Sequence, residues 1–220
     1  QRELVSGWRR RADQLLALAQ EPACGQGAVE LPEYLSVTGF GRLVKDPRGY
    51  SAELRRPMPR LVSEAQRWGI AFHEWLQQRF QGQSPLLDGE EDAAIAGVEF
   101  DELRAGFEAG PYARAVPLAV EAPFTLVLGG RLVRGRIDAV FAGDGGRPQV
   151  VDWKTGDARR ADPLQLACYR LAWAELNGLN PDQVDAVFYD LRAREVIRPV
   201  GLPDRRGLEA LLAATPDSLS

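Results

Sequence analysis

The chain has 220 residues, of which 45% are hydrophobic and 26% are charged, and its formal net charge is −4. This composition excludes a disordered chain and is sufficient for one domain with a buried core. No apolar run is long enough to cross a bilayer and the start lacks a secretory hydrophobic region, so we expect a cytoplasmic protein with no membrane partner. The chain does not begin with Met, which indicates either a piece of a longer polypeptide or a processed terminus.

Two features limit the cofactors. Cys24 and Cys168 are too few to build a four-cysteine zinc or iron–sulfur site, so we predict no iron–sulfur cluster. The sequence also contains no Gly-x-x-x-x-Gly-Lys-Ser/Thr phosphate loop, so we predict that this chain binds no ATP. Any ATP-driven motor must therefore belong to another part of the polypeptide or to another subunit.

The N-terminal segment shows a helical pattern. Residues 2–18 place apolar side chains at near-helical intervals and end before a proline. We interpret residues 1–34 as a helical segment that acts as a linker or packs against missing parts.

Three further helices are predicted before residue 81. Ser36 or Thr38 can cap the first of them, and Ser63 with Gln66 forms a capping box at the start of the third. The third helix carries His73, the only histidine in the chain. The expected ranges are 36–44, 48–55 and 63–80.

The second half of the chain is rich in strand signals. Apolar and β-branched runs alternate there with glycine-rich turns, and two helical patterns are inserted among them. Such an order predicts an α/β fold with a mixed central sheet flanked by helices, after a helical N-terminal portion. The expected strands are 118–128, 133–141, 149–154, 184–191 and 196–200, and the expected helices are 161–177 and 204–214.

Two aspartates define the most informative pair of strands. Residues 142–147 have the composition of a hairpin turn, and a turn centred on Gly145 places Asp138 opposite Asp152. Because side chains alternate along a strand, Lys154 shares a face with Asp152, while Trp153 points to the other face. Opposed carboxylates destabilise a sheet, and a bound divalent cation would remove that repulsion. The alternative is a salt bridge on a solvated sheet face, either between Asp152 and Lys154 or between Asp138 and Arg136.

Several segments together resemble the RecB-type nuclease domains of the PD-(D/E)XK superfamily. The resemblance extends from about residue 35 to the end and indicates that 35–220 is the nuclease domain. Within that family the chain is most similar to the C-terminal nuclease module of AdnB-like helicase-nucleases of actinobacteria. The matching segments are Leu35-Ser36-Val37-Thr38, Arg56-Pro57-Met58-Pro59-Arg60, Ala71-Phe72-His73, Gly135-Arg136-Ile137-Asp138, Asp152-Trp153-Lys154-Thr155-Gly156 and Asp162-Pro163-Leu164-Gln165-Leu166, with Tyr169.

The resemblance implies a restriction-endonuclease-like fold and a set of site residues. Asp138, Asp152 and Lys154 would be catalytic. Mg²⁺ or Mn²⁺ would be held by His73, Asp138, Asp152 and the backbone carbonyl of Trp153. From periodicity alone, a lone histidine between Phe72 and Trp75 is most often a packing residue, and the resemblance is what favours metal binding by His73.

Other residues are expected to support the reaction. Glu121 is either an exposed strand charge or a further acidic group near the metal, and the nearby Pro123 predicts an edge or bulged strand. Gln165 and Tyr169 share a helix face and either pack on the sheet, bind a phosphate or orient Lys154. A net charge of −4 is unusual for a protein that binds DNA. We therefore expect a basic partner to deliver the DNA, so that this chain needs only a short cationic path. Arg159 and Arg160 suit that path.

These expectations combine into a functional prediction. The chain would be a metal-dependent DNA nuclease of the exonuclease type that processes double-strand breaks for repair. Its partners would be DNA, as single strands or duplex ends, a helicase motor domain in the same polypeptide and a second helicase-nuclease subunit. Two alternatives stay open: a noncatalytic DNA-binding or scaffolding module of the same fold, and a standalone restriction-type endonuclease.

Overall fold

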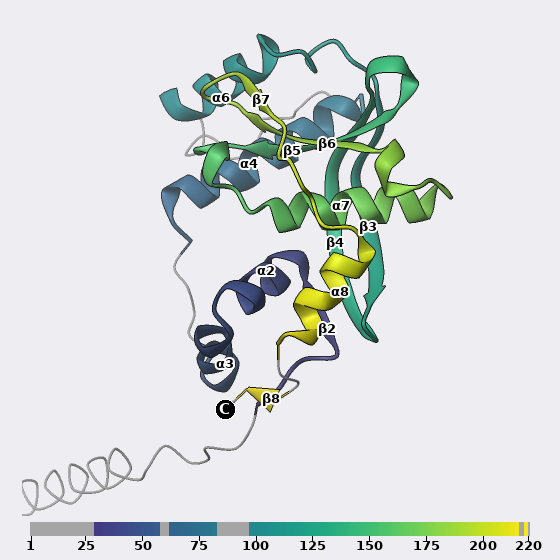
Figure 1. Cartoon of the computed structure of the whole chain (residues 1–220). Coiled ribbons are helices and arrows are strands. Elements are labelled where there is room, and N and C mark those ends of the chain that lie inside the picture. The colour runs from purple at the N-terminus through teal and green to yellow at the C-terminus, as the bar shows by residue number, and fades with distance from the viewer. Residues whose placement is uncertain (1–28, 58–61, 83–96, 216–217, 220) are drawn as a thin grey trace, which may run out of the picture.

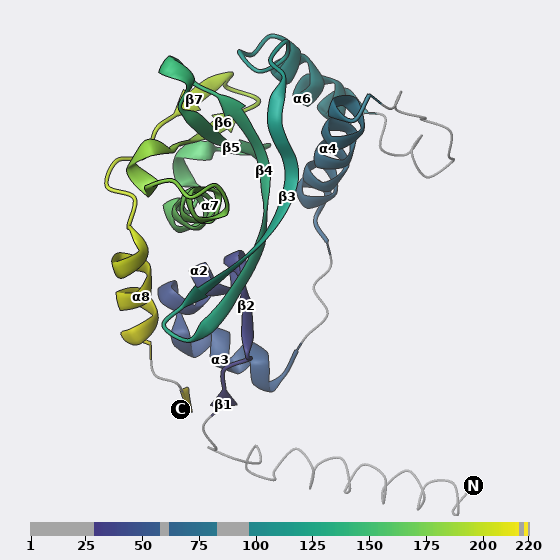
Figure 2. The same ribbon diagram turned by 90° about the vertical axis from the view of Figure 1, so that its right-hand side faces the viewer.

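The computed structural model describes residues 29–57, 62–82, 97–215 and 218–219. The helix predicted over residues 2–18 lies outside these ranges, as does most of the segment 1–34. A twisted central sheet runs through the molecule and carries helices on both faces (Figures 1 and 2). The predicted restriction-endonuclease-like fold class is therefore confirmed. None of the helices within the described ranges is both long and apolar enough to span a membrane.

A long strand, β4 (Arg131–Ala142), organises the sheet. β3 (Pro117–Leu128) pairs antiparallel along one edge of β4. The other edge is shared by β2 (Tyr34–Ser36), parallel to β4 at one end, and β5 (Pro148–Lys154), antiparallel at the other end. The sheet continues with β6 (Asp185–Asp190), parallel to β5, and β7 (Glu195–Ile197), antiparallel to β6; β1 (Val29–Glu30) and β8 (Ser218–Leu219) form a separate antiparallel pair.

The hairpin between β4 and β5 has the predicted register. Ala139 pairs with Val151 and Val140 with Val150, which is the alignment that places Asp138 level with Asp152. Gly145 in the turn has a φ of 66°, a left-handed conformation that glycine adopts without strain. The paired ladder ends at Ala139, and beyond this point β4 leaves β5 and reaches β2 instead.

Side-chain caps lie at the starts of most described helices, and the two that the sequence predicted are present. Ser36 accepts a hydrogen bond from the Gly39 amide at the first helix, and Ser63 and Gln66 form a complete capping box at the third. One helix, α6, was not predicted, because its start at Gly97 has no side-chain cap. The helices are α2 (Val37–Lys45), α3 (Pro47–Arg55), α4 (Glu64–Phe80), α6 (Val98–Glu108), α7 (Pro163–Leu176) and α8 (Arg205–Ala213).

Among the described residues, buried apolar side chains form one cluster on each face of the sheet. The first lies between the sheet and α2, α7 and α8, and the second lies beneath α4 and α6. Trp153 belongs to the second, where its ring meets Phe107 edge-on with 5.6 Å between centroids. Trp153 thus points away from the face of Asp152 and Lys154, as predicted. Gly135 lies in the first cluster, where an added Cβ would stand 2.7 Å from atoms of Phe124 and Val37.

Candidate metal and nuclease site

The sheet is irregular at the level of Asp138. Ile137 packs in the cluster beside α7, whereas Ala139 packs in the cluster beneath α4. Residues two apart normally share a face, so the alternation of β4 is interrupted between them. The neighbouring strand β3 is irregular at the same level, because its residue Glu121 has a left-handed φ of 49°. Asp138 therefore stands where β4 diverges from β5 and is reached from both faces of the sheet.

Asp138 is buried and shares its surroundings with other acids. Its Oδ2 accepts a hydrogen bond from the Trp153 amide at 3.1 Å, which supplies one favourable contact. Burial, repulsion from Asp152 and a hydrogen bond between the two carboxyl groups nevertheless raise the pKa of Asp138 well above its usual range. A carboxyl group that resists ionisation beside a second carboxylate is a site where a cation can replace the shared proton.

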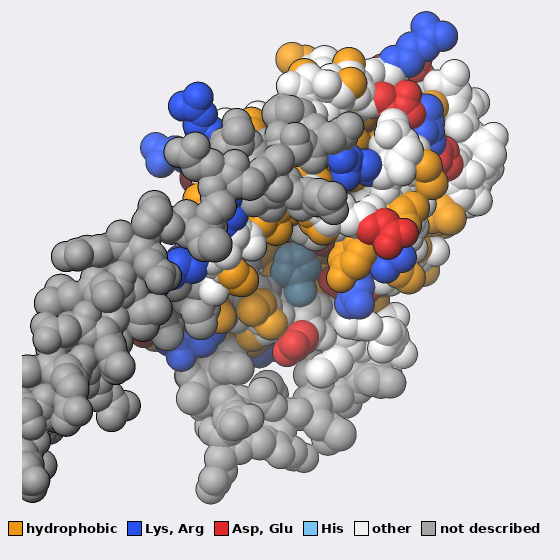
Figure 3. Space-filling view, turned by 90° about the horizontal axis from the view of Figure 1, so that it is seen from below, with side chains coloured by type: hydrophobic (Ala, Val, Ile, Leu, Met, Phe, Trp, Pro, Cys, Tyr) orange, Lys and Arg blue, Asp and Glu red, His pale blue; other side chains and the backbone are white. Residues whose placement is uncertain are grey.

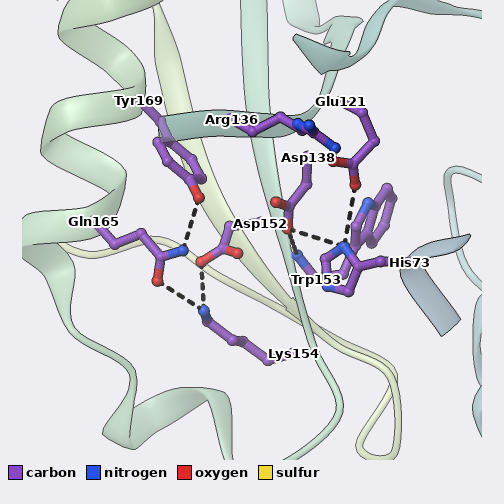
Figure 4. Close-up of polar contacts among 9 residues, drawn as sticks. All are labelled: His73, Glu121, Arg136, Asp138, Asp152, Trp153, Lys154, Gln165 and Tyr169. Carbon is purple, nitrogen blue, oxygen red and sulfur yellow. Dashed lines mark hydrogen bonds and ion pairs between the residues drawn. The ribbon is translucent and has the colours of Figure 1, made fainter. Parts of the chain in front are cut away.

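Three side chains from three elements approach one another closely enough to share a cation. His73 of α4, Glu121 of β3 and Asp138 of β4 each offer a ligand atom, and these atoms lie within 4.8 Å of one another. His73 Nδ1 is 3.4 Å from Glu121 Oε1 and 3.8 Å from Asp138 Oδ2 (Figure 4). Two oxygen donors and one imidazole fit Mg²⁺ or Mn²⁺, with the nitrogen better suited to Mn²⁺.

Asp152 lies beside this triad and is held by Lys154. Its side chain is 2% exposed, and its Oδ2 lies 2.7 Å from Lys154 Nζ. That contact has the distance of an ion pair but not the geometry of a hydrogen bond, so Oδ2 is left without one. Asp152 is therefore also under-satisfied and positioned between the triad and the ammonium group.

Lys154 is oriented by a short chain of hydrogen bonds from α7. Its Nζ donates to Gln165 Oε1 at 3.0 Å, and Gln165 Nε2 donates to the Tyr169 hydroxyl at 2.8 Å (Figure 4). Gln165 thus contacts Lys154 directly, whereas Tyr169 contacts Gln165 and also packs edge-on against Phe124 in the core. Burial, together with the negative charges of Asp138 and Asp152, raises the pKa of Tyr169, so its hydroxyl keeps its proton.

Glu121 is closer to the site than its strand position suggested. Its side chain is 14% exposed, and its second oxygen lies 3.5 Å from Arg136 Nη1. β3 pairs with β4 alone among the described strands, which confirms the edge position expected near Pro123. The register shift falls between Pro117 and Ala119, several residues before that proline. Left-handed backbone at Glu121, rather than a bulge, accompanies its contact with His73.

Arg159 and Arg160 are exposed but already ion-paired. Arg159 Nη2 lies 2.8 Å from Glu195 Oε2, and Arg160 Nε lies 3.4 Å from Asp157 Oδ2. Both belong to the short 3-10 helix Ala158–Arg160 after β5. Their charges are partly balanced where they stand.

Two contributors to the site were missed by the sequence. Arg136 was noted only as a possible partner of Asp138, yet it contacts Glu121. Asp190, at the end of β6, accepts hydrogen bonds from the amides of Ala158, Arg192 and Ala193 at 2.8 to 3.0 Å. It thereby fixes the loop that follows Lys154. The signal for Asp190 was an acid at the end of an apolar strand beside the Asp-x-Lys strand.

His73 is the residue through which the metal site meets the surface. Figure 3 shows it at the bottom of a hollow, with acidic, basic and apolar side chains around it. His73 has 30% of its side chain exposed, whereas Asp138 and Asp152 lie deeper. The carboxylates can therefore be reached from solvent past the imidazole.

The chain is similar to one known family and to solved structures. Residues 34–217 match the family model described as "PD-(D/E)XK nuclease superfamily". The fold is similar to the crystal structure of a "Putative exonuclease" from Eubacterium rectale, with a TM-score of 0.53 and 13% identity over 83% of this chain and 77% of that one. A second structure, of SSO0001, aligns over 96% of this chain and 85% of that one at 15% identity, but its TM-score is 0.38.

No curated protein matches the chain significantly. The family match covers nearly all of the described domain and includes every residue of the site. The chain belongs to the PD-(D/E)XK nuclease superfamily.

Proposed function

We propose that this chain is a Mg²⁺- or Mn²⁺-dependent deoxyribonuclease of the exonuclease type, and that it serves as the nuclease module of a helicase-nuclease that processes double-strand breaks. The observation that carries the catalytic part is the buried pair of Asp138 and Asp152 with Lys154 beside it. PD-(D/E)XK nucleases use divalent metals, and the acid and imidazole donors fit such an ion.

The metal is assigned to His73, Glu121, Asp138, Asp152 and the carbonyl oxygen of Trp153. The amide of Trp153 faces Asp138, and the N–H and C=O of one strand residue point to the same side, which supports the carbonyl as a donor. A bound divalent cation supplies Lewis acidity at a phosphate oxygen and makes a water molecule more acidic.

The residues themselves divide the remaining work. Lys154 has three N–H donors; Gln165 accepts from one and Asp152 is the ionic partner. Its remaining N–H groups position the attacking water, and its positive charge offsets the negative charge that gathers on the phosphate. Asp152 keeps the ammonium beside the reacting phosphate, while Gln165 and Tyr169 fix its direction.

The helicase setting rests on the sequence resemblance to AdnB-like modules. Because this sequence contains no phosphate loop, the motor would lie in another part of the polypeptide or in another subunit. In the complete helicase-nuclease, Asp152→Ala is expected to stop DNA cleavage while ATP-driven unwinding continues. Cleavage that survives this change, or unwinding that is lost with it, would contradict the division of roles.

The catalytic proposal is tested on the purified chain. With Mn²⁺ it should degrade single-stranded DNA, EDTA should stop the reaction, and Asp152→Ala should abolish it with the circular dichroism spectrum unchanged. Undiminished cleavage by that variant rejects the assignment. A folded wild-type chain that binds DNA but does not cleave it with either metal would instead favour a noncatalytic module, and a defined cut sequence would favour a restriction-type endonuclease.

A further inference from the structure

The lower part of the β3–β4 ribbon has one open face. Phe124, Leu126 and Val133 point into the core beside α2, so their neighbours along each strand point the other way. α4 covers only the upper part of that other face, next to the site (Figure 2). Below α4, no other helix or strand within the described ranges covers this face, and Thr125, Val127, Arg134 and Arg136 are exposed there.

The open face presents cross-strand rows that lead to the site. Tyr34, Leu132 and Val127 form the outermost row, and Ser36, Arg134 and Thr125 form the next. Arg136 follows, opposite Pro123, and its guanidinium contacts Glu121 of the triad. Arg134 lies four residues from Asp138, or about 13 Å along the strand. The rows therefore form a continuous surface that ends at the metal ligands.

This surface carries positive charge in an acidic protein. Along the stretches 122–128 and 131–137, Arg134 and Arg136 lie on this face, and neither stretch contains an aspartate or glutamate, although the whole chain has a net charge of −4. Among the described residues, Arg134 has no carboxylate partner, and its guanidinium lies over the Tyr34 ring, 5.0 Å from the centroid. A cation that lacks a protein carboxylate beside a reactive site is suited to a phosphate.

An exposed aromatic ring accompanies that charge. Tyr34 is 57% exposed and Val127 is 53% exposed. Bases of a single strand have free faces that stack on an aromatic ring or on an arginine plane, whereas bases in a duplex are already stacked on each other. The stacked pair of Tyr34 and Arg134 is therefore matched to unpaired nucleotides.

We propose that this face, formed by Tyr34, Arg134 and Arg136 with Thr125 and Val127, binds single-stranded DNA and leads it to the catalytic site. The inference rests on the proposed nuclease function and adds the nature of the strand and its path. A base stacks on Tyr34 or the guanidinium of Arg134, while both arginines hold phosphates.

Binding is measured separately from cleavage. Fluorescence anisotropy with labelled dT₁₂ is performed on the full chain carrying Asp152→Ala, which should bind DNA without cutting it. Adding Tyr34→Ala should weaken binding about 5- to 100-fold, whereas Tyr34→Phe keeps the ring and should retain affinity within about twofold. Adding Arg134→Ala should reduce the steepness of log K against log salt by about 0.7, the value for one lost phosphate contact on a single strand.

Arg206→Ala is the matched control, because Arg206 is an exposed cation on α8 at the opposite face of the ribbon. It should leave both affinity and salt dependence unchanged. If the Tyr34→Ala and parent chains bound dT₁₂ with equal affinity, the single-strand path would be overturned. It would also be overturned if Tyr34→Ala weakened binding to dT₁₂ and to a dA₁₂·dT₁₂ duplex by the same factor. The nuclease proposal fails on a different result, namely absence of metal-dependent cleavage by the wild-type chain.

Discussion

Two buried carboxylates, Asp190 at the end of β6 and Asp138 within β4, are treated in opposite ways by this fold. Asp190 is 6% exposed and accepts hydrogen bonds from three backbone amides. Asp138 is 7% exposed and accepts one such bond, while a second carboxyl group competes with it for a proton. The first carboxylate is satisfied by the protein alone, and the second is left in need of a cation.

The difference lies in what surrounds each group rather than in the depth of burial. Asp190 is followed by a tight loop whose amides converge on it, so its negative charge stabilises the local backbone. Asp138 stands at the gap between β4 and β5. The backbone pairing of the two strands ends there, and other acidic side chains converge on the same place. Under-satisfied acids destabilise a folded protein, so their presence in a cleft indicates chemistry rather than structure.

The largest expected effect comes from making the unsatisfied acid neutral. Asp138→Asn can keep the bond from the Trp153 amide, but it removes a negative ligand and the repulsion with Asp152. We expect metal-dependent cleavage to fall by about 1,000-fold or more, while the metal-free chain becomes more stable by roughly 1 kcal/mol. Initial rates with Mn²⁺ and urea unfolding in EDTA measure the two effects. If Asp138→Asn lowered the stability of the metal-free chain as well as the activity, the proposed contrast between Asp138 and Asp190 would be wrong.

The same substitution at the satisfied acid should act in the opposite direction on stability. Asp190→Asn replaces one acceptor oxygen by an NH₂ group that faces the N–H donors of the loop. The hydrogen bonds that remain are then accepted by a neutral oxygen instead of a carboxylate. We expect the free energy of unfolding to drop by about 2 to 4 kcal/mol. Urea unfolding against the Asp138→Asn chain is the direct comparison. A neutral effect at Asp190 would show that its three bonds do not hold the loop.

The raised pKa of Asp138 also predicts that the stability of the chain depends on pH. The folded pKa of Asp138 is raised above the usual 3.8, so the folded chain binds more protons than the unfolded chain between these two values. Its contribution to stability is complete below pH 3.8 and is lost as the pH rises through the raised pKa, at up to about 1.4 kcal/mol per pH unit.

This contribution is isolated by subtracting the stability of the Asp138→Asn chain from that of the wild type at each pH, in EDTA. The difference should become less favourable with rising pH, and saturating Mn²⁺ should reverse the trend because the metal binds the ionised carboxylate. A difference that does not change with pH would mean that Asp138 titrates normally.

Local patterns predicted much of the site. The register that aligns Asp138 with Asp152 followed from the glycine-rich turn, and the helix that carries His73 followed from the capping box of Ser63 and Gln66. These signals lie within a few residues of the structure they determine. Turns and caps act through bonds between near neighbours, which is why sequence alone reveals them.

Other features depend on contacts between distant segments. Strict alternation could not predict that β4 changes face at Asp138, nor that Glu121 adopts a left-handed backbone beside His73. The parallel pairing of the three-residue strand at Tyr34 with β4 carries no local signal either. Such features arise where three elements meet, and their energies come from packing that no short window contains.

The smallest expected effect tests whether the bonds behind Lys154 act in series. Tyr169→Phe removes the hydroxyl that accepts from Gln165, yet it keeps the ring that packs edge-on against Phe124. One lost hydrogen bond should lower kcat about 2- to 10-fold. Gln165→Ala removes the direct contact with Lys154 and should cost more. Because Tyr169 reaches Lys154 only through Gln165, the double variant should be no slower than Gln165→Ala alone. Multiplying losses would instead mean that Tyr169 acts on the substrate by its own route.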